Sequence, residues 1–202
     1  MTPIRRAFDA FTLTETAIVL SILGMVLVGI WAAYNAINDS NQANRNYTIL
    51  TELSHNIRTI YGNQAAARQP RDGDDNRPIT LTLINNSAFP PDLRVNDTGD
   101  EDTSRAVTQW GVNLFVQLIP PGGLWGFGPG YAINYVGLSV PQCIRLAQNI
   151  VQNRDENTVW LRINDDTSDY NLSDPATTPD ENAISTRCRT ADPALIAVGM
   201  VF

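Results

Sequence analysis

The sequence predicts an α+β fold in which one long N-terminal helix, half of it transmembrane, packs against an antiparallel β-sheet. Three observations support this prediction. An apolar block runs from Ala17 to Ala33, an amphipathic pattern continues to Tyr61, and segments rich in β-branched and aromatic residues follow residue 110. One long helical pattern followed mainly by strand-like segments is typical of the α+β class.

Composition excludes several kinds of chemistry. The chain has 202 residues, 43% of them apolar, which is enough for a hydrophobic core. All 14 basic residues are arginines, so a Walker-type phosphate lysine, a Schiff-base lysine and lysine isopeptide links are excluded. The single histidine, His55, excludes a multi-histidine metal site. The net charge of −7 disfavours a nucleic-acid partner. We expect no enzyme activity, no cofactor and no metal site.

The apolar block has the composition of a membrane-spanning helix. No charged residue lies between Glu15 and Asp39. As a helix, Ala17–Ala33 spans about 25 Å, close to the thickness of a bilayer's hydrocarbon core. Arg5 and Arg6 precede the block, so the positive-inside rule places the first ten residues in the cytoplasm and the rest of the chain beyond residue 38 outside it.

Three kinds of segment are compatible with this block: a cleaved secretory signal, a plain signal anchor, and a membrane helix that needs an acid at its start. Residues 31–36, Trp-Ala-Ala-Tyr-Asn-Ala, are a poor match to a secretory cleavage site. A plain anchor has no use for Glu15, because carrying a carboxylate toward hydrocarbon costs on the order of a few kcal/mol. The position of Glu15 therefore indicates that a cationic group pairs with its carboxylate.

Residues 10–24, Ala-Phe-Thr-Leu-Thr-Glu-Thr-Ala-Ile-Val-Leu-Ser-Ile-Leu-Gly, resemble the processing site and membrane segment of type IV prepilins. The family usually has glycine where Ala10 stands and a larger apolar residue at Thr14. The resemblance implies that a prepilin peptidase cleaves between Ala10 and Phe11 and N-methylates Phe11. It also implies that Glu15 meets the amino terminus of a neighbouring subunit, and that the segment around Gly24 unwinds in the filament. Close helix packing is the simpler interpretation of Gly24.

Beyond the membrane block the helix is predicted to continue to Tyr61, with Gly62 as its C-cap. Apolar residues recur there at steps of three and four, at Ala43, Tyr47, Leu50, Leu53, Ile57, Ile60 and Tyr61. We therefore divide the chain into four parts. They are a leader (1–10), the transmembrane and polymerisation half of the helix (11–34), its amphipathic half (35–61) and a globular α+β head (62–202).

The head contains four predicted strands and one helix after a long polar loop. The strands are Val112–Ile119, Tyr131–Leu138, Thr158–Ile163 and Ala194–Phe202, and the helix is Val140–Val151. Residues 79–84 fit either a strand or a helix. The order of the Ile57–Gly62, Leu83–Pro90 and Gln109–Val112 motifs resembles the type IVb, PilS-like major pilins, which implies a short helix there.

Cys143 and Cys188 lie in the part predicted to face an oxidising compartment, so a disulfide is expected. Closing this loop contributes about 4 kcal/mol in the chain-entropy model. A free catalytic cysteine is the alternative, but no second histidine or redox Cys-x-x-Cys accompanies it. In pilins such a disulfide bounds a variable C-terminal region, which the resemblance implies here too.

Other motifs are predicted to be structural. The glycine-rich stretch 122–130 lacks a following lysine and is expected to connect two strands of a hairpin. Three acidic clusters, within 72–75, 97–102 and 165–169, lack the EF-hand spacing and are expected to be solvated loops.

The resulting functional hypothesis is a structural subunit of a bacterial type IV pilus, serving adhesion, conjugation or aggregation. Its expected partners are copies of itself joined through their N-terminal helices, the prepilin peptidase, an inner-membrane assembly platform and minor pilins. It would lie in the inner membrane with its head outside the cytoplasm, and then in an extracellular filament. The alternatives are a minor pilin or type II secretion pseudopilin, and, from another class, a signal-anchored periplasmic enzyme or binding protein.

Overall fold

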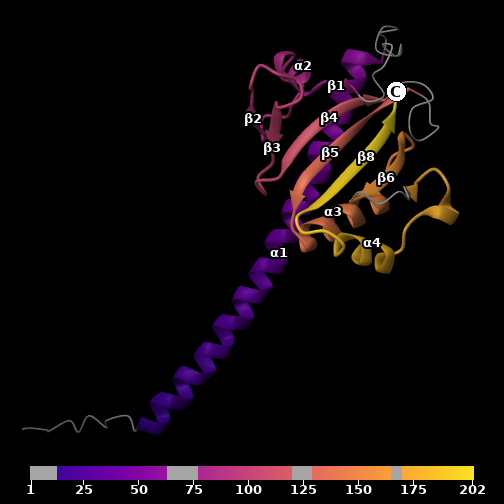
Figure 1. Ribbon diagram of the computed structural model, residues 1–202. Helices are drawn as coiled ribbons and strands as arrows, with labels where there is room; N and C mark the ends of the chain where they lie inside the picture. Colours follow the sequence, from indigo (N-terminus) through magenta and orange to yellow (C-terminus); the bar gives the residue numbers. More distant parts are fainter. Residues whose placement is uncertain (1–12, 63–76, 120–128, 165–169) are drawn as a thin grey trace, which may run out of the picture. The chain divides into compact units, whose positions relative to one another are not determined.

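The computed structural model describes residues 13–62, 77–119, 129–164 and 170–202 (Figure 1). The chain divides into two compact units, Met1–Asp39 and Ser40–Phe202. The first is described from Leu13 onward and consists of helix alone. The second contains the rest of that helix and the sheet.

Helix α1 runs without interruption from Leu13 to Tyr61, 49 residues. It ends at the residue predicted from the apolar pattern. The backbone N–H of Gly62 donates to the Arg58 carbonyl at 2.7 Å and closes the last turn. A Cβ on Gly62 would lie 2.4 Å from that oxygen, so the close approach requires glycine.

The described strands form one eight-stranded sheet in which every pair is antiparallel. Its order is β2-β3-β4-β5-β8-β6-β7, and β1 pairs with β4. The strands are β1 (Arg77–Pro78), β2 (Arg94–Asn96), β3 (Arg105–Val107), β4 (Asn113–Ile119), β5 (Gly130–Leu138), β6 (Thr158–Ile163), β7 (Tyr170–Asn171) and β8 (Ala194–Val201). The C-terminal strand β8 therefore lies between β5 and β6 in the middle of the sheet (Figure 1).

The described part of the head also contains three shorter helices and one 3₁₀ turn. They are α2 (Thr80–Asn85), α3 (Val140–Asn153), η2 (Pro175–Thr177) and α4 (Glu181–Cys188). Pro141 occupies the first turn of α3, where its missing N–H costs nothing. The Ser139 N–H donates to the Gln142 side chain at 2.9 Å and caps the same turn.

The α+β prediction is confirmed, with differences in detail. The four predicted strands and the α3 helix are present, and residues 80–85 are helical, as the family resemblance implied. Strands β1, β2, β3 and β7 were not predicted, because two or three residues are too few to show a period. Helix α4 was not predicted either, since it buries only Ile184 and Cys188. The glycine-rich connection from β4 to β5 lies mostly outside the described residues.

The core lies between α1 and one face of the sheet. Side chains Leu50, Leu53 and Ile57 of α1 are fully buried against alternate residues of the central strands. The sheet residues in this cluster include Leu114, Val116, Tyr131, Ile133, Tyr135, Ile196 and Val198. Alternation along β5 and β8 places Ala132 and Ala197 in a smaller cluster with Trp160 and Val159. The sheet therefore buries apolar side chains in two separate clusters.

Trp160 packs across Gly199, its cross-strand neighbour on β8. A Cβ built on Gly199 would lie 1.7 Å from Trp160 Nε1 and 1.8 Å from Cε2. The indole therefore occupies the space that any side chain at this position would need, an arrangement in which an aromatic ring covers a strand glycine.

We expect Gly199→Ala to destabilise the head by about 1–3 kcal/mol, because the indole must move out of a packed cluster. Urea unfolding of the full chain in detergent micelles measures this loss. Gly29→Ala is the matched control, since no atom lies within 4 Å of its new methyl group. Equal stability of the two variants would contradict the packing described for Trp160.

Candidate functional site

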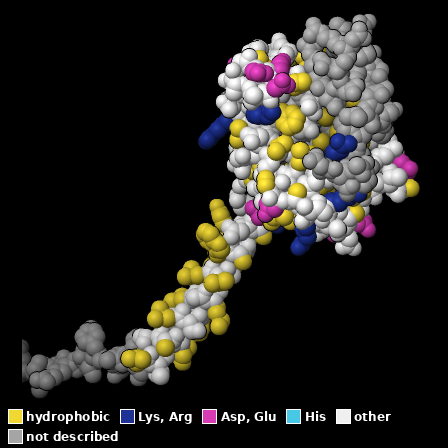
Figure 2. Space-filling model, in the orientation of Figure 1, with side chains coloured by type: hydrophobic (Ala, Val, Ile, Leu, Met, Phe, Trp, Pro, Cys, Tyr) yellow, Lys and Arg dark blue, Asp and Glu magenta, His cyan; other side chains and the backbone are white. Residues whose placement is uncertain are grey.

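The first 27 described residues of α1 form a helix whose large apolar side chains are exposed. Fourteen large apolar side chains between Leu13 and Ile37 are 49–86% exposed. Figure 2 shows hydrophobic side chains projecting at intervals along this part of the helix, with white atoms between them. This is the one helix in the described chain that is long and apolar enough to cross a membrane. Such a surface is unstable in water and has to be covered by lipid or by other protein.

Glu15 lies in the first turn of α1 and is exposed. A carboxylate there interacts favourably with the positive end of the helix dipole. The neighbouring Thr16 hydroxyl donates to the Leu13 carbonyl at 2.9 Å, so this turn satisfies a backbone oxygen locally. Ala10 and Phe11, the predicted processing residues, lie outside the described residues.

Gly24 lies in the middle of the apolar segment, where the helix is regular. No atom lies within 4 Å of a Cβ built at this position. Contacts within the described chain therefore do not require glycine here. Alanine is favoured over glycine in a helix by about 1 kcal/mol, so Gly24 also lowers the helix propensity of this segment.

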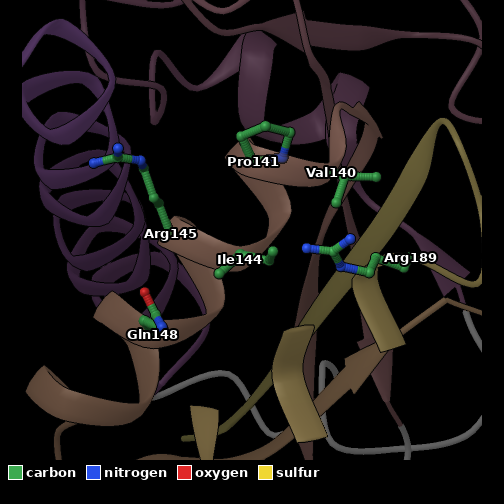
Figure 3. A pocket seen from close by; sticks show the side chains of 6 residues that line it. All are labelled: Val140, Pro141, Ile144, Arg145, Gln148 and Arg189. Carbon is green, nitrogen blue, oxygen red and sulfur yellow. The ribbon is translucent and has the colours of Figure 1, made fainter. Parts of the chain in front are cut away.

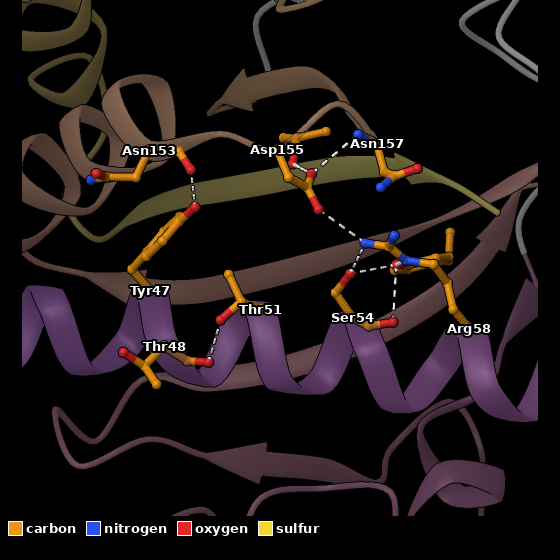
Figure 4. A network of polar contacts seen from close by, with 10 residues as sticks. Tyr47, Thr48, Thr51, Ser54, Arg58, Asn153, Asp155 and Asn157 are labelled. Carbon is orange, nitrogen blue, oxygen red and sulfur yellow. Dashed lines mark hydrogen bonds and ion pairs between the residues drawn. The ribbon is translucent and has the colours of Figure 1, made fainter.

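A polar network joins the second half of α1 to the loop between α3 and β6 (Figure 4). Arg58 donates from Nη2 to Asp155 Oδ2 at 3.1 Å and to Ser54 Oγ at 2.7 Å. Its Nε donates to the Tyr131 hydroxyl at 3.3 Å. Tyr131 and Ser54 share a further hydrogen bond of 2.7 Å. The network thus connects α1, β5 and the α3–β6 loop through a single guanidinium group.

Two contacts extend this connection. The Tyr47 hydroxyl donates to the Asn153 carbonyl at the end of α3, and the Tyr135 hydroxyl donates to the Asn46 carbonyl at 3.3 Å. Burial raises the pKa of Tyr135 and of Tyr131, so both phenols stay neutral donors at physiological pH. Local sequence patterns do not predict this network, because Arg58 and Asp155 are 97 positions apart.

Asp155 is the acid of the network. Its partial burial on its own would raise its pKa, but hydrogen bonds from Thr158, Arg58 and Asn157, with the Arg58 charge, lower the pKa below its ordinary value. Thr158 Oγ1 donates to Asp155 Oδ1 at 2.6 Å. The ionised form is therefore the one that the folded head stabilises.

The predicted disulfide is present between Cys143 and Cys188, whose Cα atoms are 5.8 Å apart. Both residues are fully buried. The bond joins α3 to the end of α4 and closes the part of the chain that contains β6, β7 and η2. The described residues contain no free cysteine.

The acidic cluster at 97–102 differs from the predicted solvated loop in one respect. Glu101 accepts hydrogen bonds from the backbone N–H groups of Leu81 and Thr82, at 2.7 and 2.9 Å, and so caps helix α2. Asp97 and Asp100 accept local backbone hydrogen bonds within the loop. Within residues 13–62, 77–119, 129–164 and 170–202, no three His, Cys, Asp or Glu side chains are grouped to hold a metal ion. The other two acidic clusters lie outside this range.

We expect Asp155→Asn to lower the stability of the head by about 1 kcal/mol at pH 7, a figure that allows for the partial exposure of the ion pair. Since the folded pKa is depressed, the stabilisation is fully present above the ordinary carboxyl pKa of about 4 and is lost as pH falls through the folded value. The difference between the parent chain and the variant should therefore shrink below about pH 4. Urea unfolding at several pH values measures it.

Asp92→Asn is the control, because Asp92 pairs with Arg45 at 2.8 Å between two exposed side chains. It should cost less than Asp155→Asn. A loss for Asp155→Asn that is the same at pH 7 and pH 3 would contradict the role given to the carboxylate charge.

No protein-family model matches the chain, and no curated protein matches it at a significant level. Among solved structures, the chain is similar to a type IV b pilin from Salmonella typhi. The two are 18% identical, and the alignment covers 75% of this chain and 99% of that one with a TM-score of 0.47. The function of this protein is therefore inferred from its own residues.

Proposed function

We propose that this protein is the structural subunit of a type IV pilus, cleaved by a prepilin peptidase before Phe11 and polymerised through its N-terminal helix. The single observation that carries the proposal is the helix Leu13–Asp39, which exposes its apolar side chains on every side and has Glu15 in its first turn. The prepilin-like sequence at 10–24 and the disulfide-bonded α+β head agree with it.

The exposed apolar helix requires two successive environments. Each large apolar side chain contributes about 1.5–3 kcal/mol when it leaves water, so the segment is stable in a bilayer and unstable outside one. A subunit can leave the membrane only if other helices replace the lipid around these side chains. Bundling with copies of the same helix provides that replacement, and it explains why the segment is apolar all round rather than on one face.

Glu15 sets the register of this bundle. Cleavage before Phe11 creates a positively charged amino terminus, and a carboxylate four residues further on can pair with the terminus of a neighbouring subunit. Two charges that are each costly in an apolar environment become tolerable when they are paired. Each subunit has one such carboxylate and one such amine, so pairing them fixes the axial offset between adjacent helices.

Gly24 belongs to the same mechanism. Its missing side chain serves no contact in the described chain, so we assign it to close approach of neighbouring helices or to local unwinding during assembly. A glycine in the middle of a long helix lowers the free-energy cost of either change relative to alanine, because it has no Cβ and more backbone freedom.

The route that follows has two stages. The subunit first lies in the bacterial inner membrane, with its head outside the cytoplasm, where the disulfide can form. The assembly platform and minor pilins then collect processed subunits into an extracellular filament. A minor pilin or a type II secretion pseudopilin would share residues 10–61, and high abundance in sheared surface material distinguishes a major subunit from both.

The mass of the N-terminal peptide tests this proposal in its native cell. We expect sheared surface material to contain a chain that begins with N-methylated Phe11. A chain that retains Met1 and is confined to the membrane would overturn the proposal and favour an anchored periplasmic enzyme or binding protein.

We expect Glu15→Ala to abolish or strongly reduce the sheared filaments, because the amino terminus of each neighbour loses its partner. The variant should still reach the membrane and form the Cys143–Cys188 disulfide, since Glu15 lies outside the head. Glu52→Ala removes an exposed acid from the head half of the same helix and is the matched control. Electron microscopy and immunoblotting of sheared fractions measure the result, and normal filaments from Glu15→Ala would contradict the mechanism.

A further inference from the structure

A groove with a basic and apolar lining lies on the outer side of α3, next to the end of α4 (Figure 3). Its volume is about 370 Å³, and it is lined by Val140, Pro141, Ile144, Arg145, Gln148 and Arg189. In Figure 3 the Arg189 side chain extends from the α4 side toward Val140 and Ile144, whereas Arg145 extends from α3 toward α1. Two cationic groups therefore flank a small apolar patch.

The groove continues past Arg145. A second hollow of about 110 Å³ shares Arg145 and Gln148 with the first and reaches Ser40 and Ala43 of α1. Among the described residues, no acid lines either hollow. Within the described part of the chain, the ion pairs are Arg45–Asp92 and Arg58–Asp155, so neither Arg145 nor Arg189 is neutralised by an ion pair there. In a protein with a net charge of −7, a concave surface of this kind is suited to an acidic segment with an apolar residue.

Strand β2 and the residue after it present that combination. Val95 is 44% exposed and is the one large apolar side chain of the described head that is markedly exposed. Asp97 follows two residues later, directly after the end of the strand, and is also exposed. β2 is also an edge strand among the described strands, where β3 is its one partner.

The loop after β2 is held in a defined conformation. The Gly99 N–H donates to Asp97 Oδ1 at 2.8 Å, and the Asp102 N–H donates to Asp100 Oδ1 at 2.9 Å. Glu101 is fixed on the N-terminus of α2, while Asp97, Asp100 and Asp102 remain exposed. The acids that face outward are thus presented on an ordered turn, at little further cost in conformational entropy on binding.

The groove and the acidic turn lie at opposite edges of the sheet. β2 is the first strand in the sheet order, while α3 and α4 contact β8 and β6 toward the other end (Figure 1). A molecule therefore cannot place its own acidic turn in its own groove. Two complementary surfaces on different sides of one subunit make a heterologous contact, which gives an open helical assembly when the rotation between subunits does not close into a ring.

We propose that the acidic edge of one subunit, Val95 with Asp97 and the following turn, docks into the α3 groove of the next subunit. Val95 covers the patch formed by Val140, Pro141 and Ile144, while the carboxylates pair with Arg145 and Arg189. The inference rests on the proposed filament function and adds to it a contact between heads.

Engineered disulfide cross-linking in filaments tests this contact directly. In the chain with both Val95→Cys and Gln148→Cys, mild oxidation of sheared filaments should give a ladder of covalent oligomers beyond the dimer. Each single-cysteine variant can give dimers at most. The pair Val95→Cys and Glu156→Cys is the control, because Glu156 is exposed on the α3–β6 loop and lines neither hollow. Filaments of normal yield without a ladder would overturn the proposed contact and leave the filament function standing.

Charge exchange tests the electrostatic part. Arg145→Glu with Arg189→Glu, and separately Asp97→Arg with Asp102→Arg, place like charges at the contact and should reduce sheared filaments at least about tenfold. Combining all four substitutions restores opposite charges and should recover most of the yield, which also shows that the variants fold. Glu156→Arg should leave the yield unchanged.

Three results would count against the contact. Unchanged filaments in both reversed variants, or no recovery in the combined variant, would overturn it while the Glu15→Ala result still supports the filament. Absence of filaments from the unmodified chain would overturn the contact together with the proposed function.

Discussion

The structure depends on one continuous helix that must satisfy two different environments. Along Ile49, Leu53 and Ile57, α1 buries one face completely against the sheet. Along Leu13–Asp39 it exposes apolar side chains on every side. A helix of 49 residues is far longer than those of ordinary globular domains, and its head half derives stability from the sheet rather than from helix propensity. The apolar half has no such support in the described chain, so lipid or other protein has to cover it.

The Arg58 network adds to the stability of the contact between the second half of α1 and the sheet. A lysine at this position would offer a single compact charge, whereas the guanidinium group donates to Asp155, Ser54 and Tyr131 at the same time. Because Ser54 and Tyr131 are buried, removing the arginine would leave them with each other as partners and Asp155 without its cation. The all-arginine composition, which excluded lysine chemistry at the outset, is thus used here for multivalent hydrogen bonding at the junction of helix and sheet.

The sequence was sufficient for the parts of the fold that repeat a pattern over many residues. The helix end at Tyr61, the central strands and the disulfide follow from periodicity, β-branched content and cysteine count. The sequence was insufficient to predict elements that depend on a single contact between residues far apart in the chain. Short strands such as β2 exist only because β3 pairs with them, and Glu101 caps α2 from 20 residues away. The Arg58–Asp155 pair is separated by 97 positions, so no local spacing could have revealed it. The processing residues Ala10 and Phe11 and the assembly residues Glu15 and Gly24 come from the sequence resemblance alone and stay predictions, because a single chain contains neither the peptidase nor a neighbouring subunit.

Charge adds a constraint on any assembly of these heads. A chain cleaved before Phe11 loses two arginines and one aspartate, so each subunit carries a formal side-chain charge of −8. Heads packed along a fibre would repel one another over about one Debye length, roughly 8 Å at physiological salt. Apolar burial of the helices therefore has to supply the free energy of assembly, while contacts between heads must oppose the repulsion locally. In the contact proposed above, Arg145 and Arg189, which form no ion pair in the described part of the chain, would meet exposed carboxylates on a fixed turn of the next head, so few charges would be needed. Added salt weakens both the repulsion and the attraction, so the register of the heads, more than the existence of the fibre, should depend on ionic strength.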